Sequence, residues 1–194
     1  MKKSTLLVLL IAFLAVAVGV SGCLDNDGNN STNNSTSNNT SNNTTSITSF
    51  DEKVVQLNPI PTGFELLFAK PVTADAENIG GITDALAGYS AAYMYNNSSA
   101  DGVYLSVFKC DNNTAAAGYV QSMIDAHNAK YPNSSNVTTV KVNGHDATLI
   151  TRNVQGVGGN ESYELAWNNN EYLVVVNGPA AYNLMLAIAD ASNL

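Results

Sequence analysis

Residues 49–194 are predicted to form one α+β domain, an antiparallel β-sheet of about six to seven strands with two main helices packed on one face. Three observations lead to this prediction. Several short segments alternate apolar and polar residues with the period of two that is typical of strands. The pair Asn143-Gly144 between two such segments predicts a hairpin, because both residues tolerate positive φ. Two longer segments repeat apolar residues at helical spacing.

The first predicted strand covers residues 64–68 and follows a turn-rich stretch at 58–63. Residues 71–88 are ambiguous: a helical turn over 74–78, ended by Gly80-Gly81, is one interpretation. The later elements are strands 89–95 and 102–110, a helix over 114–130, strands 137–142, 145–152, 161–167 and 171–177, and a closing helix after Gly178-Pro179.

Both helices have one apolar face. The residues of the first helix that share a face at 3.6-residue spacing are Ala116, Tyr119, Val120, Met123 and His127. Pro132 is expected to end this helix, and Pro179 is expected in the first turn of the second. The residues of the second helix that should pack on the sheet are Ala181, Leu184, Met185 and Ile188.

Residues 1–22 read as a secretory signal. Lys2 and Lys3 precede an apolar run over 6–18, which is shorter than the roughly 20 residues needed to span a bilayer. Its end, Val20-Ser21-Gly22-Cys23, resembles the lipobox of prokaryotic lipoproteins, which implies cleavage before Cys23 and attachment of a diacylglyceryl group to its thiol. Two acyl chains give stable membrane attachment. An uncleaved signal-anchor and a Cys23–Cys110 disulfide are the alternatives.

Residues 23–48 are predicted to be a disordered tether behind the lipidated Cys23. This segment consists almost entirely of Asn, Ser and Thr and has too few apolar residues to offset chain entropy. Motifs of the Asn-x-Ser/Thr type recur in it, and the candidate glycosylation sites are Asn30, Asn34, Asn39 and Asn43, among overlapping alternatives. Further motifs of this type lie in the domain, at Asn97, Asn112, Asn133, Asn136 and Asn160.

The charge of the chain argues against nucleic acid as a partner. The formal net charge is -8, and loss of Lys2 and Lys3 with the leader would make it -10. A domain so poor in Lys and Arg offers no surface for phosphate groups. We therefore expect a partner from the cell envelope, or a small apolar or sugar ligand.

The second half of the domain resembles known proteins at the level of pattern. The segments that carry the resemblance are Val142-Asn143-Gly144-His145-Asp146-Ala147-Thr148, Tyr163-Glu164-Leu165-Ala166-Trp167, Tyr172-Leu173-Val174-Val175-Val176 and Leu186-Ala187-Ile188-Ala189. Their order is similar to small α+β domains of prokaryotic lipoproteins and to the PsbP-like and LolA-like groups. With the tether, the chain resembles uncharacterised surface lipoproteins of methanogenic archaea. The resemblance implies a fold rather than an activity.

Residues suited to catalysis are few. Cys110, His127 and His145 could form a thiolate site only if the fold brought them together, and a buried thiol with two unrelated histidines is the simpler reading. The histidine and cysteine spacing matches no zinc site. The glycines of 156–159 lack the basic residue and the following helix of a phosphate loop. The acids on neighbouring predicted strands are Asp146, Glu161, Glu164 and Glu171, which we read as a solvated face.

Aromatic residues form the strongest candidate site. By strand parity Tyr89, Tyr93 and Tyr95 share one face, and Tyr163 and Trp167 share another. They either fill a sheet face beneath the helices or line a surface for an apolar or sugar ligand.

The sequence thus predicts a lipid-anchored protein on the extracytoplasmic face of the cell membrane, with a non-catalytic binding domain, no cofactor and no metal. An envelope hydrolase and a purely structural, glycosylated surface component are the alternatives.

Overall fold

The computed structural model describes residues 50–75, 79–133, 135–153 and 161–194. The predicted leader, Cys23 and the tether with its four candidate glycosylation sites lie outside the described residues. So do the loop glycines of 156–159 and most of the helical turn considered over 74–78.

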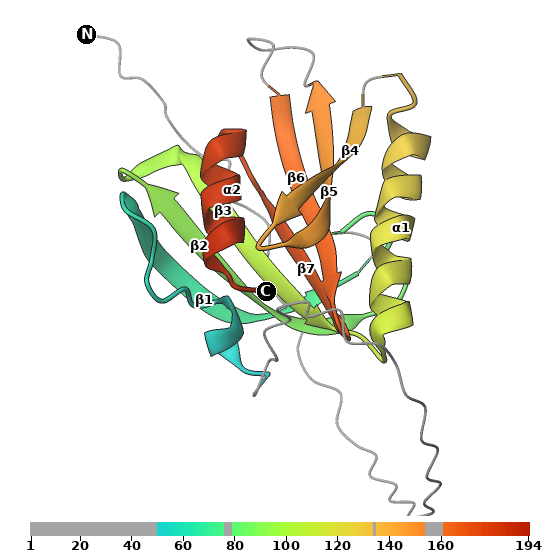
Figure 1. Ribbon diagram of the computed structural model, residues 1–194, viewed down its shortest axis with the longest axis horizontal. Coiled ribbons are helices and arrows are strands. Elements are labelled where there is room, and N and C mark those ends of the chain that lie inside the picture. The colour runs from blue at the N-terminus through green and yellow to red at the C-terminus, as the bar shows by residue number, and fades with distance from the viewer. Residues whose placement is uncertain (1–49, 76–78, 134, 154–160) are drawn as a thin grey trace, which may run out of the picture. The chain divides into compact units, whose positions relative to one another are not determined.

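The domain is an antiparallel sheet with two α-helices and one 3-10 helix. In chain order its elements are η1 (Glu52–Val55), β1 (Phe64–Ala74), β2 (Leu86–Tyr95), β3 (Ser98–Lys109), α1 (Asn113–Lys130), β4 (Ser135–Val142), β5 (His145–Asn153), β6 (Glu161–Asn169), β7 (Tyr172–Gly178) and α2 (Tyr182–Ala191). The seven strands lie in the order β1-β2-β3-β7-β6-β5-β4, with β1 and β4 at the edges (Figure 1). The predicted α+β class and antiparallel sheet are confirmed.

The two helices lie on opposite faces of the sheet, so the prediction that both pack on one face was wrong. Val174 and Val176 of β7 belong to the apolar cluster that α2 joins. Leu173 and Val175 belong to the cluster that α1 joins. Successive side chains of a strand point to opposite faces, so these two clusters occupy opposite sides of one sheet. Figure 1 shows β5, β6 and β7 between the two helices.

The sequence of β7 contains the signal for this arrangement. Its first five residues, 172–176, are all apolar and all buried. A strand covered on one face alternates apolar with polar residues, whereas an unbroken apolar run is typical of a strand covered on both faces. The run at 172–176 therefore requires cover on each side of the sheet, and the two helices provide it.

The face under α2 is also covered by the segment that precedes β1. The hydroxyl of Tyr93 donates a hydrogen bond to the carbonyl of Val55 (2.6 Å) and accepts one from the amide of Leu57 (2.8 Å). Phe50 packs against the rings of Tyr89 and Tyr172, each at 5.3 Å between centroids. Residues 50–57, the N-terminal segment of the domain, are thereby fixed to the sheet beside α2.

The hairpin predicted at Asn143-Gly144 is confirmed. Both residues have positive φ, 48° for Asn143 and 85° for Gly144, as a tight turn between two strands requires. The amide of Asn143 also donates to the carboxylate of Asp190, near the end of α2.

Two predicted boundaries differ from the structure. β1 continues six residues past Phe68 to Ala74 and includes Pro71, because an edge strand tolerates a residue that cannot donate to a neighbouring strand. The second helix begins at Tyr182, and exposed Ala181 is its N-cap. Pro179 therefore precedes the helix instead of opening it.

Candidate functional site

The face of the sheet that carries α1 is covered unevenly. α1 packs against β6, β7 and β4. On the same face, Phe68 of β1 and Tyr104 of β3 are 40% and 42% exposed. Large apolar side chains are normally buried in a sheet that has a helix on each face. These two rings mark the part of the sheet that α1 leaves open.

A continuous line of residues crosses five strands at this position. Phe68 pairs with Ala92, Ala92 with Tyr104, Tyr104 with Asn177, and Asn177 with Glu164. Directly paired residues project to the same face of a sheet, so these five form one row, called the open row below. Neighbouring strands lie about 4.8 Å apart, which puts the two aromatic residues about 10 Å from each other.

The open row ends in a partly buried ion pair. Arg152 of β5 lies 4.0 Å from the carboxylate of Glu164, and its guanidinium lies 5.8 Å from the centre of the Tyr131 ring, just beyond α1. Burial raises the pKa of Glu164, and the charge of Arg152 opposes that rise. Desolvation and the charge of Arg152 therefore shift the pKa of Glu164 in opposite directions, and desolvation has the larger effect.

Two polar atoms beneath the end of α1 lack partners. Nε2 of His127 and Nε of Arg152 are buried and make no hydrogen bond within the described part of the chain. Burial, followed by the charge of Arg152, lowers the pKa of His127. The His127 ring packs on Tyr131 at 5.1 Å. Near this end of α1, buried polar atoms therefore lack hydrogen bonds among the described residues.

Polar groups flank the aromatic end of the open row. Nζ of Lys70 lies 5.0 Å from the centre of the Phe68 ring. One strand further in, the Ser106 hydroxyl donates to the hydroxyl of Ser90 at 2.9 Å. The surface therefore combines two exposed rings with hydroxyl, amide and ammonium groups. Such a combination suits a ligand that is apolar on one side and polar at its edges.

The aromatic residues singled out in the sequence lie on the other face. Tyr93 and Trp167 are 0% and 1% exposed and belong to the α2-side cluster. Tyr89 and Tyr163 are half-buried against that cluster, and Tyr95 packs on Phe64 at 5.1 Å. The predicted parity is confirmed for Tyr89 with Tyr93 and for Tyr163 with Trp167. A ligand-facing role does not fit the burial of Tyr93 and Trp167, which are core residues.

The sequence offered a weak signal for the open row. In β3 the buried residues Val103, Leu105 and Val107 alternate with Tyr104 and Ser106. A tyrosine at a position that alternation assigns to the other face is either covered by a second layer or exposed. Only the position of α1 decides between the two, and the sequence analysis placed both helices on one face without separating them.

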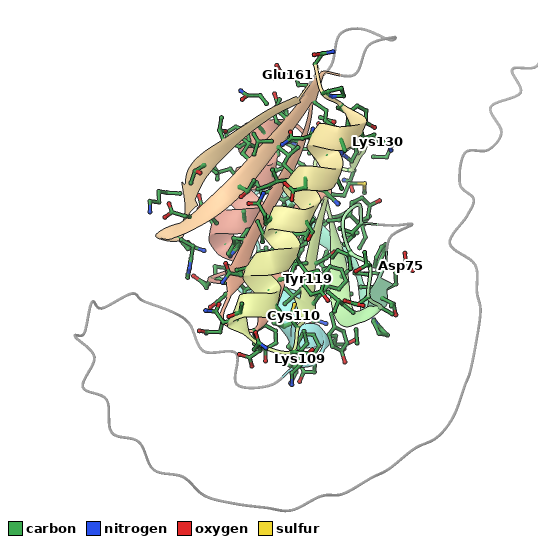
Figure 2. All side chains as sticks on the ribbon, turned by 90° about the vertical axis from the view of Figure 1, so that its right-hand side faces the viewer. Asp75, Lys109, Cys110, Tyr119, Lys130 and Glu161 are labelled. Atoms are coloured by element: carbon green, nitrogen blue, oxygen red, sulfur yellow. The ribbon has the colours of Figure 1, made fainter. Side chains whose placement is uncertain are left out.

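Cys110 and the two histidines are not brought together. Cys110 is buried in the α1-side cluster, where burial raises the pKa of its thiol. Figure 2 shows Cys110 with Lys109 at one end of α1, and Lys130 at the other. His127 is one turn of helix from Lys130. His145 pairs with Val142 at the β4–β5 turn. The described structure therefore forms no thiolate-imidazole pair.

The four candidate acids are also separated. Glu164 belongs to the open row, whereas Glu161 accepts a hydrogen bond from the Tyr163 hydroxyl on the α2 side. Asp146 forms an exposed ion pair with Lys141 at 2.7 Å, and Glu171 lies in the β6–β7 turn. No group of three or more potential metal ligands occurs among the described residues. Within the same residues, no helix has the length and apolar character to cross a bilayer.

A loop is fixed to α1 near Cys110. The Tyr119 hydroxyl donates to the carboxylate of Asp84 at 2.8 Å, and this bond raises the pKa of Tyr119 to about 12. Ile82 of the same loop is fully buried in the α1-side cluster. The loop thus extends the cover of α1 over the end of the sheet away from Lys130, and the open row remains uncovered beyond it.

These features define an α+β domain with a helix on each face and one partly open face. Residues 82–191 match the family described as Domain of unknown function (DUF4367), and the chain belongs to that family. The matched segment starts after β1 and ends with α2.

Two solved structures show a distant similarity, and no curated protein matches the chain. One is a GTP binding regulator from Thermotoga maritima, with 12% identity and a TM-score of 0.40 over 73% of this chain and 83% of that one. The other is the extracellular domain of PknH from Mycobacterium tuberculosis, with 16% identity and a TM-score of 0.43 over 73% of this chain and 88% of that one.

Proposed function

We propose that the protein is a lipid-anchored surface protein whose domain binds an oligosaccharide of the cell envelope without catalysing a reaction. The observation that carries the proposal is the exposure of Phe68 and Tyr104 on a face that α1 covers elsewhere. The domain would then bind this oligosaccharide at the open row.

Sugar is the ligand whose chemistry matches this surface. A pyranose ring presents C–H groups on its faces and hydroxyls around its edge. The C–H faces can pack on the rings of Phe68 and Tyr104, while Asn177 and Glu164 provide hydrogen-bond partners for hydroxyls. A wholly apolar ligand would desolvate Asn177 without giving its carboxamide a hydrogen-bond partner, which is costly.

The placement of the candidate nucleophile and acids within the described residues favours a binding role. The thiol of Cys110 is buried and its pKa is raised, so it is poorly suited to attack a substrate. The candidate carboxylates Glu161 and Glu164 project from opposite faces of β6. A glycosidase needs two carboxyl groups flanking one bond, and these two do not have that arrangement.

The placement outside the membrane rests on the sequence. The apolar run over 6–18, the lipobox ending in Cys23 and the polar tether fit a lipoprotein that holds its domain away from the bilayer. As a random coil, a tether of about 20 residues spans on the order of 25 Å. The resemblance to surface lipoproteins of methanogenic archaea supports the same placement.

Binding is tested by titrating the full mature chain with tetrasaccharides of glucose and of N-acetylglucosamine and measuring heat. We expect binding at millimolar or lower concentration, and Tyr104→Ala and Phe68→Ala each to weaken it about tenfold, since one ring contact is worth about 1.4 kcal/mol. Ile60→Ala is the matched control, because Ile60 is an exposed apolar residue outside the open row. Equal binding by all three variants would contradict the proposal.

The anchor is tested separately by fractionating cells that make the protein. Wild-type chain should be recovered with the membrane and have the mass of a diacylated chain beginning at Cys23. Cys23→Ser should lose the lipid. Recovery of wild-type protein in the cytosol with residues 1–22 intact would overturn the placement and leave the binding result unaffected.

A further inference from the structure

The two edges of the sheet are protected differently. β1 contains Pro71, which lacks an amide donor, and its pairing with β2 is interrupted between Leu66 and Phe68. Both features hinder addition of another strand. β4, at the other edge, pairs regularly with β5 from Ser135 to Val142 and contains no proline. Among the described residues no strand pairs with its outer side, and a regular edge without proline is one to which a strand from another molecule can add.

An acceptor motif for N-linked sugar lies on this unprotected edge. Asn136-Val137-Thr138 satisfies the Asn-x-Ser/Thr pattern, and both Asn136 and Thr138 are exposed. Residues two apart in a strand project to the same side, so the acceptor amide and the hydroxyl that defines the motif are neighbours. The acceptor is thus accessible in the folded protein.

The other motifs of the domain differ in position. The side chain of Asn112 caps α1 by accepting a hydrogen bond from the amide of Ala115 at 2.9 Å. Its Oδ1 is therefore engaged at a helix N-terminus, so this motif lies at a helix end and not on a strand. Asn97 is exposed in the β2–β3 turn and not on a strand; the amide of its neighbour Asn96 donates to the Gly63 carbonyl just before β1. Asn136 is the one acceptor asparagine that lies on an edge strand, among those whose adjacent residues the structure also describes.

We propose that Asn136 carries an N-linked glycan that covers the edge of β4. The modification joins Nδ2 of Asn136 to the anomeric carbon of the first sugar of a lipid-diphosphate-linked oligosaccharide. The bond between that carbon and the phosphate oxygen breaks, the lipid diphosphate leaves with the electron pair, and the amide gives up one proton. The reaction requires export of the chain, so this proposal rests on the placement proposed above.

A glycan at Asn136 would leave the open row accessible. Asn136 pairs with Thr151, which pairs with Tyr163 of the α2-side cluster. Asn136 therefore projects to the face opposite Phe68 and Tyr104, at the far edge of the sheet. The sugar would block strand addition at β4 without competing for a ligand on the α1 side.

Mass spectrometry of protein from the cells that make it tests the modification. Trypsin releases residues 131–141 as one peptide, which contains Asn133 and Asn136. We expect a glycan mass on this peptide, with fragmentation placing it on Asn136. Thr138→Val should remove it by destroying the motif. Thr139→Val is the matched control, because it makes the same change one residue away and keeps the motif. An unmodified Asn136 in membrane-associated wild-type protein overturns this proposal while leaving the placement intact.

The covering role is tested on the same two variants. At equal concentration, Thr138→Val should self-associate in sedimentation measurements, whereas Thr139→Val and wild type should sediment alike. If Thr138→Val lacks the glycan and sediments like the control, the glycan does not protect the edge and that part of the proposal is wrong.

Discussion

The two faces of the sheet use aromatic residues in opposite ways. On the α2 side, Tyr93 and Trp167 are buried beneath a helix and the N-terminal segment, and both side chains make hydrogen bonds. On the α1 side, Phe68 and Tyr104 remain exposed beside a helix that stops short of them. Tyr93 and Trp167 are part of the core, whereas Phe68 and Tyr104 leave apolar surface exposed. Burial, and not residue type, therefore separates core aromatics from candidate ligand contacts.

The largest expected effect is on the closed face. Trp167→Ala removes a fully buried ring and the hydrogen bond from its Nε1 to the Leu194 carbonyl (3.1 Å). We expect a loss of about 3–5 kcal/mol in the free energy of unfolding, measured by denaturant titration. A loss below about 1 kcal/mol would show that the α2-side cluster is not the core of the domain.

Tyr93→Phe should have the next largest effect. It leaves the Val55 carbonyl and the Leu57 amide without their buried partner, at a cost of about 1–3 kcal/mol. Limited proteolysis should then cleave within residues 50–57 more readily. Tyr104→Phe, which removes an exposed hydroxyl from the open face, is the control and should change neither property. Equal cleavage of the two variants would contradict the role of Tyr93.

A change at His127 tests the less satisfied end of α1. Its pKa is lowered in the folded state, so below about pH 6.5 the unfolded chain binds a proton that the folded chain does not. Stability due to neutral His127 is therefore lost as pH falls below that value. His127→Leu should lose less stability than wild type between pH 7 and 5, by denaturant titration. Glu164 has a raised pKa and contributes the opposite slope, but it is present in both proteins. Parallel pH profiles would contradict the burial of His127.

The smallest stability effect is expected at the open row. Tyr104→Ala removes a ring that is 42% exposed, and surface substitutions usually change stability by no more than about 0.5 kcal/mol. The same variant should bind sugar about tenfold more weakly, so stability and binding separate at this residue. A large loss of stability would mean that Tyr104 is a core residue, and the proposed difference between the two faces would be wrong.

Much of the fold followed from sequence pattern. Alternation, the Asn143-Gly144 turn and the helical spacing in 114–130 predicted an antiparallel α+β domain. The prediction that both helices cover one face was wrong, because hairpin patterns show that strands pair but not which face a crossing helix covers. The unbroken apolar run of β7 carried that information. Phe68 and Tyr104 were missed for the same reason, since their exposure depends on where α1 ends relative to β1 and β3.

The most direct test of the difference between the faces is residue-specific NMR of the full mature chain during titration with the N-acetylglucosamine and glucose tetrasaccharides. We expect the resonances of Phe68, Tyr104 and Asn177 to shift in a saturable way, and those of Tyr93 and Trp167 on the closed face to stay in place. Shifts confined to the α2 side, or none with either sugar at millimolar concentration, would contradict the claim that the open row is a sugar-binding surface.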